Sequence, residues 1–67
     1  MNNQVVLVKI TPATRQVSRT FYNSTADASR AAARGANHSL QWQLTDRRDV
    51  TRATYQGTIW LIGDDSA

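Results

Sequence analysis

The chain has 67 residues, which is enough for one small domain and no more. It carries a formal net charge of +3 and no cysteine, so disulfide bonds and cysteine-ligated zinc are excluded; its single histidine, His38, leaves no cluster for a structural metal. No run approaches the roughly 18 apolar residues of a membrane span, and residues 1–4 lack the basic segment of a signal peptide. We therefore expect one cytoplasmic domain over residues 1–67, with no metal, no cofactor and no membrane partner.

The first predicted elements are two strands joined by a turn that contains proline. Aliphatic residues run almost unbroken through residues 4–11, a pattern typical of a strand that is buried on both faces or lies near the centre of a sheet. Pro12 ends this strand because proline cannot donate to a sheet ladder. A second strand is expected over Gln16–Tyr22, with Val17 and Phe21 on one face. A hairpin is the simplest connection between the two.

A helix is predicted next, and it has the clearest boundary in the sequence. Ser24 is a good N-cap, and Asp27 approximates a capping box and complements the helix dipole. Five alanines follow, the residue with the highest helix propensity. Gly35, with Asn37 just beyond, is the expected stop. We expect a helix over residues 25–34 whose small side chains let it lie close on a sheet.

The strand predicted after the helix has one buried and one polar face. Leu40, Trp42 and Leu44 alternate with two glutamines, which is the period of a half-buried strand, and Trp42 is expected in the core. Residues 45–49 then form a charged turn.

The last apolar stretch, residues 50–62, is long for one strand in so small a domain. Gln56-Gly57 near its middle predicts a hairpin with strands Val50–Tyr55 and 58–62, and one long bent strand is the alternative. Residues 63–67 are expected to form a frayed polar tail. The resulting order is β-β-α-β-β-β. It predicts an α+β fold class, a single antiparallel sheet of four to five strands with one helix packed on one face.

Catalytic chemistry has little support in the sequence. There is no glutamate, and the aspartates fall in the first turn of the helix, the charged turn and the tail, where each has a structural explanation. His38 follows the predicted helix and is expected to be a loop or C-cap residue. The three glycines are isolated from one another, so no phosphate-cradling loop is expected. We expect no enzyme activity and turn to binding.

Arginine provides the candidate binding residues, because seven of the eight basic residues are arginine. Its planar side chain makes two-pronged contacts with phosphate and carboxylate groups. Arg30 and Arg34 are one helical turn apart and should project together. The candidate partner-binding residues are Arg30, Arg34, Arg47, Arg48 and Arg52.

Aromatic residues can add base stacking to phosphate contacts. Tyr22, Tyr55 and Trp60 are the aromatic residues least committed to the predicted core. An ordinary solvated surface, and a genome rich in arginine codons, are the alternative explanations for the arginines.

The predicted layout resembles the small phage-encoded anti-CRISPR proteins and, within that group, a type I-F inhibitor with a curved antiparallel sheet and one helix. The resemblance spans residues 5–62. It rests on the two short strands, the helix that opens Ser24-Thr25-Ala26-Asp27-Ala28-Ser29-Arg30, the following strand and charged turn, and a hairpin with Gly57 and Trp60.

The resemblance implies a non-enzymatic inhibitor that binds a bacterial CRISPR-Cas surveillance complex and blocks recognition of target DNA, in the cytoplasm of an infected bacterium. Many anti-CRISPR proteins are acidic DNA mimics, and this basic chain departs from that pattern, so docking on an acidic or RNA-containing surface is the expectation. A small basic nucleic-acid-binding module, with direct DNA or RNA contact, and a dimerising accessory protein are the alternatives.

Overall fold

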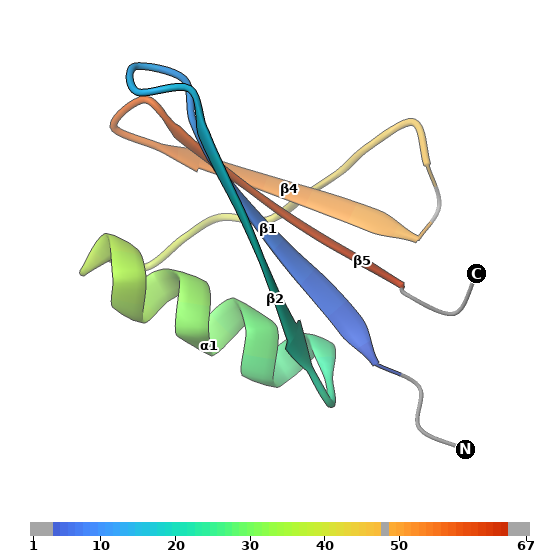
Figure 1. Ribbon diagram of the computed structural model, residues 1–67. Helices are drawn as coiled ribbons and strands as arrows, with labels where there is room; N and C mark the ends of the chain where they lie inside the picture. The colour runs from blue at the N-terminus through green and yellow to red at the C-terminus, as the bar shows by residue number, and fades with distance from the viewer. Residues whose placement is uncertain (1–3, 48, 65–67) are drawn as a thin grey trace.

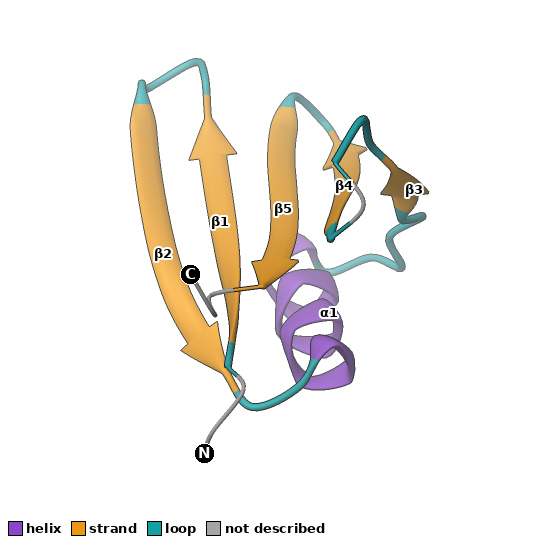
Figure 2. Ribbon diagram, turned by 90° about the vertical axis from the view of Figure 1, so that its right-hand side faces the viewer, coloured by secondary structure: helices purple, strands orange, loops and turns teal. Residues whose placement is uncertain are grey.

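The computed structural model describes residues 4–47 and 49–64 (Figure 1). Its elements are β1 (Val5–Thr11), β2 (Gln16–Tyr22), α1 (Thr25–Ala36), β3 (Gln43–Leu44), β4 (Val50–Tyr55) and β5 (Thr58–Asp64). The five strands form one antiparallel sheet in the order β2-β1-β5-β4-β3, and they lie side by side in Figure 2. The predicted α+β class and element order are confirmed.

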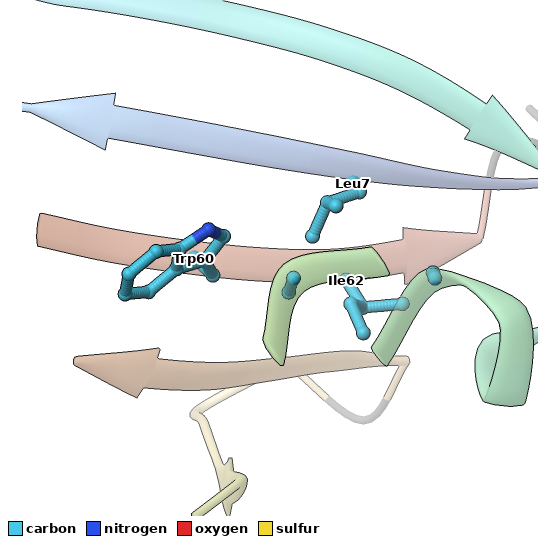
Figure 3. Close-up of a cluster of buried hydrophobic side chains, with 5 residues drawn as sticks. Leu7, Trp60 and Ile62 are labelled. Carbon is cyan, nitrogen blue, oxygen red and sulfur yellow. The ribbon is translucent and has the colours of Figure 1, made fainter. Parts of the chain in front are cut away.

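The helix covers one face of the sheet, and small side chains bring it close. Ala28 and Ala32 are 0% and 1% exposed, and they pack against Leu7 of β1 and against Trp60 and Ile62 of β5 (Figure 3). Because alanine has no bulk beyond its methyl group, the large side chains of the sheet fill the space under the helix. The core therefore sits between α1 and the two central strands.

Trp60 belongs to this core, so its expected place among the uncommitted aromatic residues is wrong. Its side chain is only 3% exposed. Trp60 and Ile62 alternate along β5 and so share the face that the helix covers. Ala53 of β4, which pairs with Trp60, is itself buried.

A side chain caps the N-terminus of α1, and backbone hydrogen bonds cap its C-terminus. At the N-terminus, Ser24 has extended backbone (φ −151°, ψ 158°), and its Oγ accepts a hydrogen bond from the Asp27 N–H at 3.1 Å. The predicted stop at Gly35 is wrong, because the helix continues to Ala36. Asn37 instead takes the left-handed conformation (φ 56°) and ends the helix there. Asparagine tolerates this conformation better than most residues do.

The third strand is shorter than its alternating sequence predicts, because only Gln43 and Leu44 pair with β4. Leu40 and Trp42 nevertheless pack against the core cluster, so the prediction of a buried Trp42 is confirmed in part. Leu44, expected on the buried face, is 83% exposed. The reason is position: α1 packs on β1, β2 and β5, and β3 lies at the far edge of the sheet.

The hairpin predicted in residues 50–62 is present. Gln56 and Gly57 both have positive φ (51° and 79°), as the tight turn of a two-residue hairpin requires. The sheet continues beyond the predicted end, because Gly63 pairs with Val6 and Asp64 with Val5. The expectation of a frayed tail from residue 63 is therefore wrong for residues 63 and 64, and residues 65–67 lie outside the described part of the chain.

The N-cap at Ser24 yields a stability prediction. Ser24→Ala should lower the free energy of unfolding by about 1 kcal/mol, because it removes the hydrogen bond to the Asp27 N–H. Chemical denaturation followed by circular dichroism measures the loss. Ser29→Ala is the matched control: it deletes the same atom inside the helix, where the hydroxyl only bonds back to the Ala26 carbonyl. Equal losses in the two variants would contradict the assigned cap.

Candidate functional site

Arg30 and Arg34 lie together on the solvent side of α1, as their spacing predicts. Both are exposed, and both line a surface hollow between the helix and edge strand β2. Tyr22 of β2 lines the same hollow and is half-buried against the core. The helix and the strand thus bring two guanidinium groups beside a phenol ring whose position the core fixes.

This hollow offers the chemistry of phosphate recognition with an adjacent stacking surface. A guanidinium group donates two parallel hydrogen bonds to a phosphate, and a tyrosine ring can support a nucleobase or another flat group. Asp27 also lines the hollow and offsets part of its positive charge. The second aromatic residue of the hollow is Phe21, which is 51% exposed. We name the hollow and the residues Tyr22, Arg30 and Arg34 the helix-edge site.

The other predicted arginines do not join the helix-edge site. Arg47 lies in the loop between β3 and β4, where its backbone N–H donates to Thr45 Oγ1 at 3.1 Å. Arg52 is exposed on β4 and pairs with Leu61, on the face of the sheet opposite the helix. Arg48 lies outside the described residues. The predicted set therefore divides into a helix pair and residues from the β3–β4 region.

The structure also reveals a surface that the sequence analysis did not single out, which we name the open face. It is the face of the sheet opposite α1, and the strand register arranges it in three cross-strand rows. The rows are Phe21–Val6–Gly63–Val50, Arg19–Val8–Leu61–Arg52 and Val17–Ile10–Ile59–Thr54. Its outer members Val17 and Phe21 are 61% and 51% exposed. The aliphatic run in residues 4–11, which predicts burial on both faces, was the available signal for this surface.

A second hollow opens on the open face, with an apolar floor and a charged rim. The floor is made by Val6, Val8 and Leu61. The β3–β4 loop forms the rim on one side with Asp46 and Arg47. We name it the open-face hollow.

One threonine holds the β3–β4 loop at the edge of the open-face hollow. Thr45 Oγ1 lies 2.9 Å from the Val50 carbonyl oxygen and 3.1 Å from the Arg47 carbonyl oxygen, and these two acceptors share its single hydroxyl proton. The Val50 N–H in turn donates to the Arg47 carbonyl at 3.3 Å. These bonds fix the backbone on both sides of the rim residues.

His38 has the structural role that was expected for it, at the C-terminal end of the helix. Its backbone N–H donates at 3.1 Å to the Ala33 carbonyl, a helix carbonyl that also accepts from the Asn37 N–H. Its imidazole stacks on Tyr55 with ring centroids 4.4 Å apart, and Nδ1 lies 2.6 Å from the Ser39 carbonyl oxygen. Because the Tyr55 ring stacks on His38, it faces the loop after the helix and not the helix-edge site.

Within residues 4–47 and 49–64, no three side chains of histidine, cysteine, aspartate or glutamate gather as a metal site would require. The one helix in this part of the chain is too short and too polar to cross a membrane. No protein-family model, no curated protein and no solved structure matches this chain.

The helix-edge site yields a prediction for nucleic-acid binding. Two phosphate contacts should give weak binding of duplex DNA with a log–log salt slope of about −2, from roughly −0.9 per phosphate neutralised. Arg30→Gln/Arg34→Gln should remove most of this binding in fluorescence anisotropy. Lys9→Gln/Arg52→Gln removes the same net charge from other exposed positions and should retain it. Equal losses in both double variants would mean that net charge, and not the hollow, attracts DNA.

Proposed function

We propose that this protein acts without catalysis, as a binding module that docks on a phosphate-bearing macromolecular partner. The observation that carries the proposal is the helix-edge site, where Arg30 and Arg34 share one exposed side of a rigid helix next to Tyr22. Arginine loses less side-chain entropy per hydrogen bond than lysine does because its planar group is preorganised, and that group suits phosphate and carboxylate. The formal net charge of +3 favours the approach of an acidic partner.

The partner that we propose is a bacterial CRISPR-Cas surveillance complex, so the protein would be a phage-type inhibitor that blocks recognition of target DNA. The resemblance of the chain to the small anti-CRISPR proteins suggests this partner. Such a complex combines protein with RNA, so it presents both carboxylates and phosphates to an arginine pair. A basic inhibitor would occupy the path of the nucleic acid by binding its protein or RNA surroundings, rather than by imitating DNA.

A free-standing nucleic-acid-binding module is the second candidate function, and the combination of arginines with Tyr22 in one hollow favours it. The two functions differ in what carries the affinity. A module binds nucleic acid tightly at physiological salt without any protein, whereas an inhibitor binds the assembled complex much more tightly than naked nucleic acid.

Co-elution with purified surveillance complexes of several types tests the first function. The protein should co-elute with one of them and reduce its binding of target DNA. Losing a charged contact that becomes buried at the interface of the complex should cost on the order of 2–5 kcal/mol of binding free energy. Arg30→Glu/Arg34→Glu should therefore abolish co-elution, while Lys9→Glu/Arg52→Glu, with the same change in net charge, should not. Melting curves control for folding, since exposed substitutions change stability by about 0.5 kcal/mol or less each.

Two results would contradict this proposal in different ways. Absence of co-elution with every complex, together with no protection of phage from CRISPR immunity in cells, would end the inhibitor hypothesis. Full co-elution of the Arg30→Glu/Arg34→Glu variant would keep the inhibitor and exclude the helix-edge site as its docking surface.

A further inference from the structure

Strand β1 carries apolar side chains on both of its faces, but residues 4–47 and 49–64 cover only one of them. Leu7 points toward α1 and is 7% exposed. Val6, Val8 and Ile10 point to the open face and are only half-buried. A strand with this composition is typical of sheets covered on both sides. Within the part of the chain that the structure describes, the open face is thus an uncovered apolar surface at the centre of the sheet.

We propose that a second copy of this chain covers the open face, so that the protein forms a symmetric dimer with its two sheets face to face. A two-fold interface must be self-complementary, because the same patch meets itself. The open face has this property. It presents a protruding ring, Phe21, at one edge, and the open-face hollow of matching apolar character on the same surface.

The strand register places the ring and the hollow at a spacing that a two-fold axis can satisfy. Phe21 lies directly opposite Val6, and the floor of the hollow extends from Val6 and Val8 to Leu61 on the next strand. A two-fold axis that runs parallel to β1, in the plane between the two sheets, therefore lays Phe21 of each copy over the hollow of the other. It also stacks Val8 of one copy on Val8 of its partner. This is the aligned packing of two sheets in a β-sandwich.

One pair of opposite charges, Arg19 and Asp46, meets across the interface in the same arrangement, and Arg47 lies on the same rim as Asp46. Arg19 is two residues from Phe21 on β2, so both side chains point from the same face. Asp46 lies on the rim of the hollow that receives Phe21 of the other copy. Each dimer therefore brings Arg19 of one copy toward Asp46 of the other, twice. Arg52 lies at the outer end of its row, beyond the partner's β2, and stays in water.

The size of the open face indicates how tight the dimer is. Three strands at about 4.8 Å spacing, carrying three rows about 6.7 Å apart, give a flat footprint of roughly 300 Å² per copy. Protruding side chains add to this, but stable specific dimers bury about 800 Å² per partner. We therefore expect a weak dimer, populated at high concentration and dissociated on dilution.

Sedimentation equilibrium of the full chain over a range of concentrations tests the dimer. The mass should rise from 7.5 kDa toward twice that value as the concentration increases. Phe21→Glu and Val17→Glu should each raise the dissociation constant at least about tenfold, because they place a charge in an apolar interface. Leu44→Glu is the matched control, since Leu44 is more exposed than either residue but lies outside the open face.

A charge exchange tests the arrangement as well as the surface. Arg19→Glu and Asp46→Arg should each weaken self-association by placing like charges together. Mixing these two variants should restore a heterodimer at least as tight as the native dimer, because both of its Arg19–Asp46 positions then carry opposite charges. Native mass spectrometry of the mixture reads this preference directly. Homodimers and heterodimers in the proportions expected for random pairing would overturn the arrangement.

Two results would overturn the proposed dimer itself. One is a mass that stays at the monomer value at protein concentrations up to about 1 mM. A dissociation constant of that size corresponds to an association free energy of only roughly 4 kcal/mol. The other is an equal effect of Leu44→Glu and Phe21→Glu. The helix-edge site is tested separately: Arg30→Glu/Arg34→Glu should leave the mass unchanged, so loss of partner binding and loss of self-association are distinguishable.

Discussion

The close approach of α1 to the two central strands is the constraint on which the rest of the structure depends. Ala28 and Ala32 allow it, and the bulk of Leu7, Trp60 and Ile62 fills the space that the small residues leave. Because these alanines fix which side of the helix faces the sheet, they also fix the opposite side, which presents Arg30 and Arg34 to solvent. The orientation of α1 about its own axis therefore determines both the core packing and the position of the helix-edge site.

One short helix also limits how much of the sheet is covered, and this divides the molecule into two surfaces of different character. Helix α1 packs on β1, β2 and β5 from one side only. That side ends in a cationic edge beside Tyr22, suited to an acidic partner. The other side is a sheet of valine, isoleucine and leucine, suited to an apolar one. The two surfaces lie on opposite sides of the sheet but share Phe21 at its β2 edge, so binding at one covers part of the border of the other.

Local sequence signals predicted most of the elements, and the failures lie where sheet order decides the outcome. The bounds of β2 and β4 and the start of α1 just after Ser24 follow from alternation, a turn dipeptide and a cap, all of which act over a few residues. The burial of Trp60 depends on β5 lying beside β1, and that position is set by a pairing between distant parts of the chain. For the same reason, spacing along the helix predicted the pair Arg30 and Arg34, but nothing local showed that Arg52 lies on the other face.

The pairing of β1 with β5 also governs the order in which the chain can fold. The hairpins β1–β2 and β4–β5 are local and can form within microseconds, whereas joining β1 to β5 closes a loop of nearly the whole described chain. Leu7 and Ile62 meet only in that step. During synthesis on the ribosome, the edge of β1 that pairs with β5 therefore stays unpaired, and its apolar side chains stay exposed, until β5 has emerged. A chain of this protein is consequently most prone to aggregation, or to capture by chaperones, before β5 is available to pair with β1.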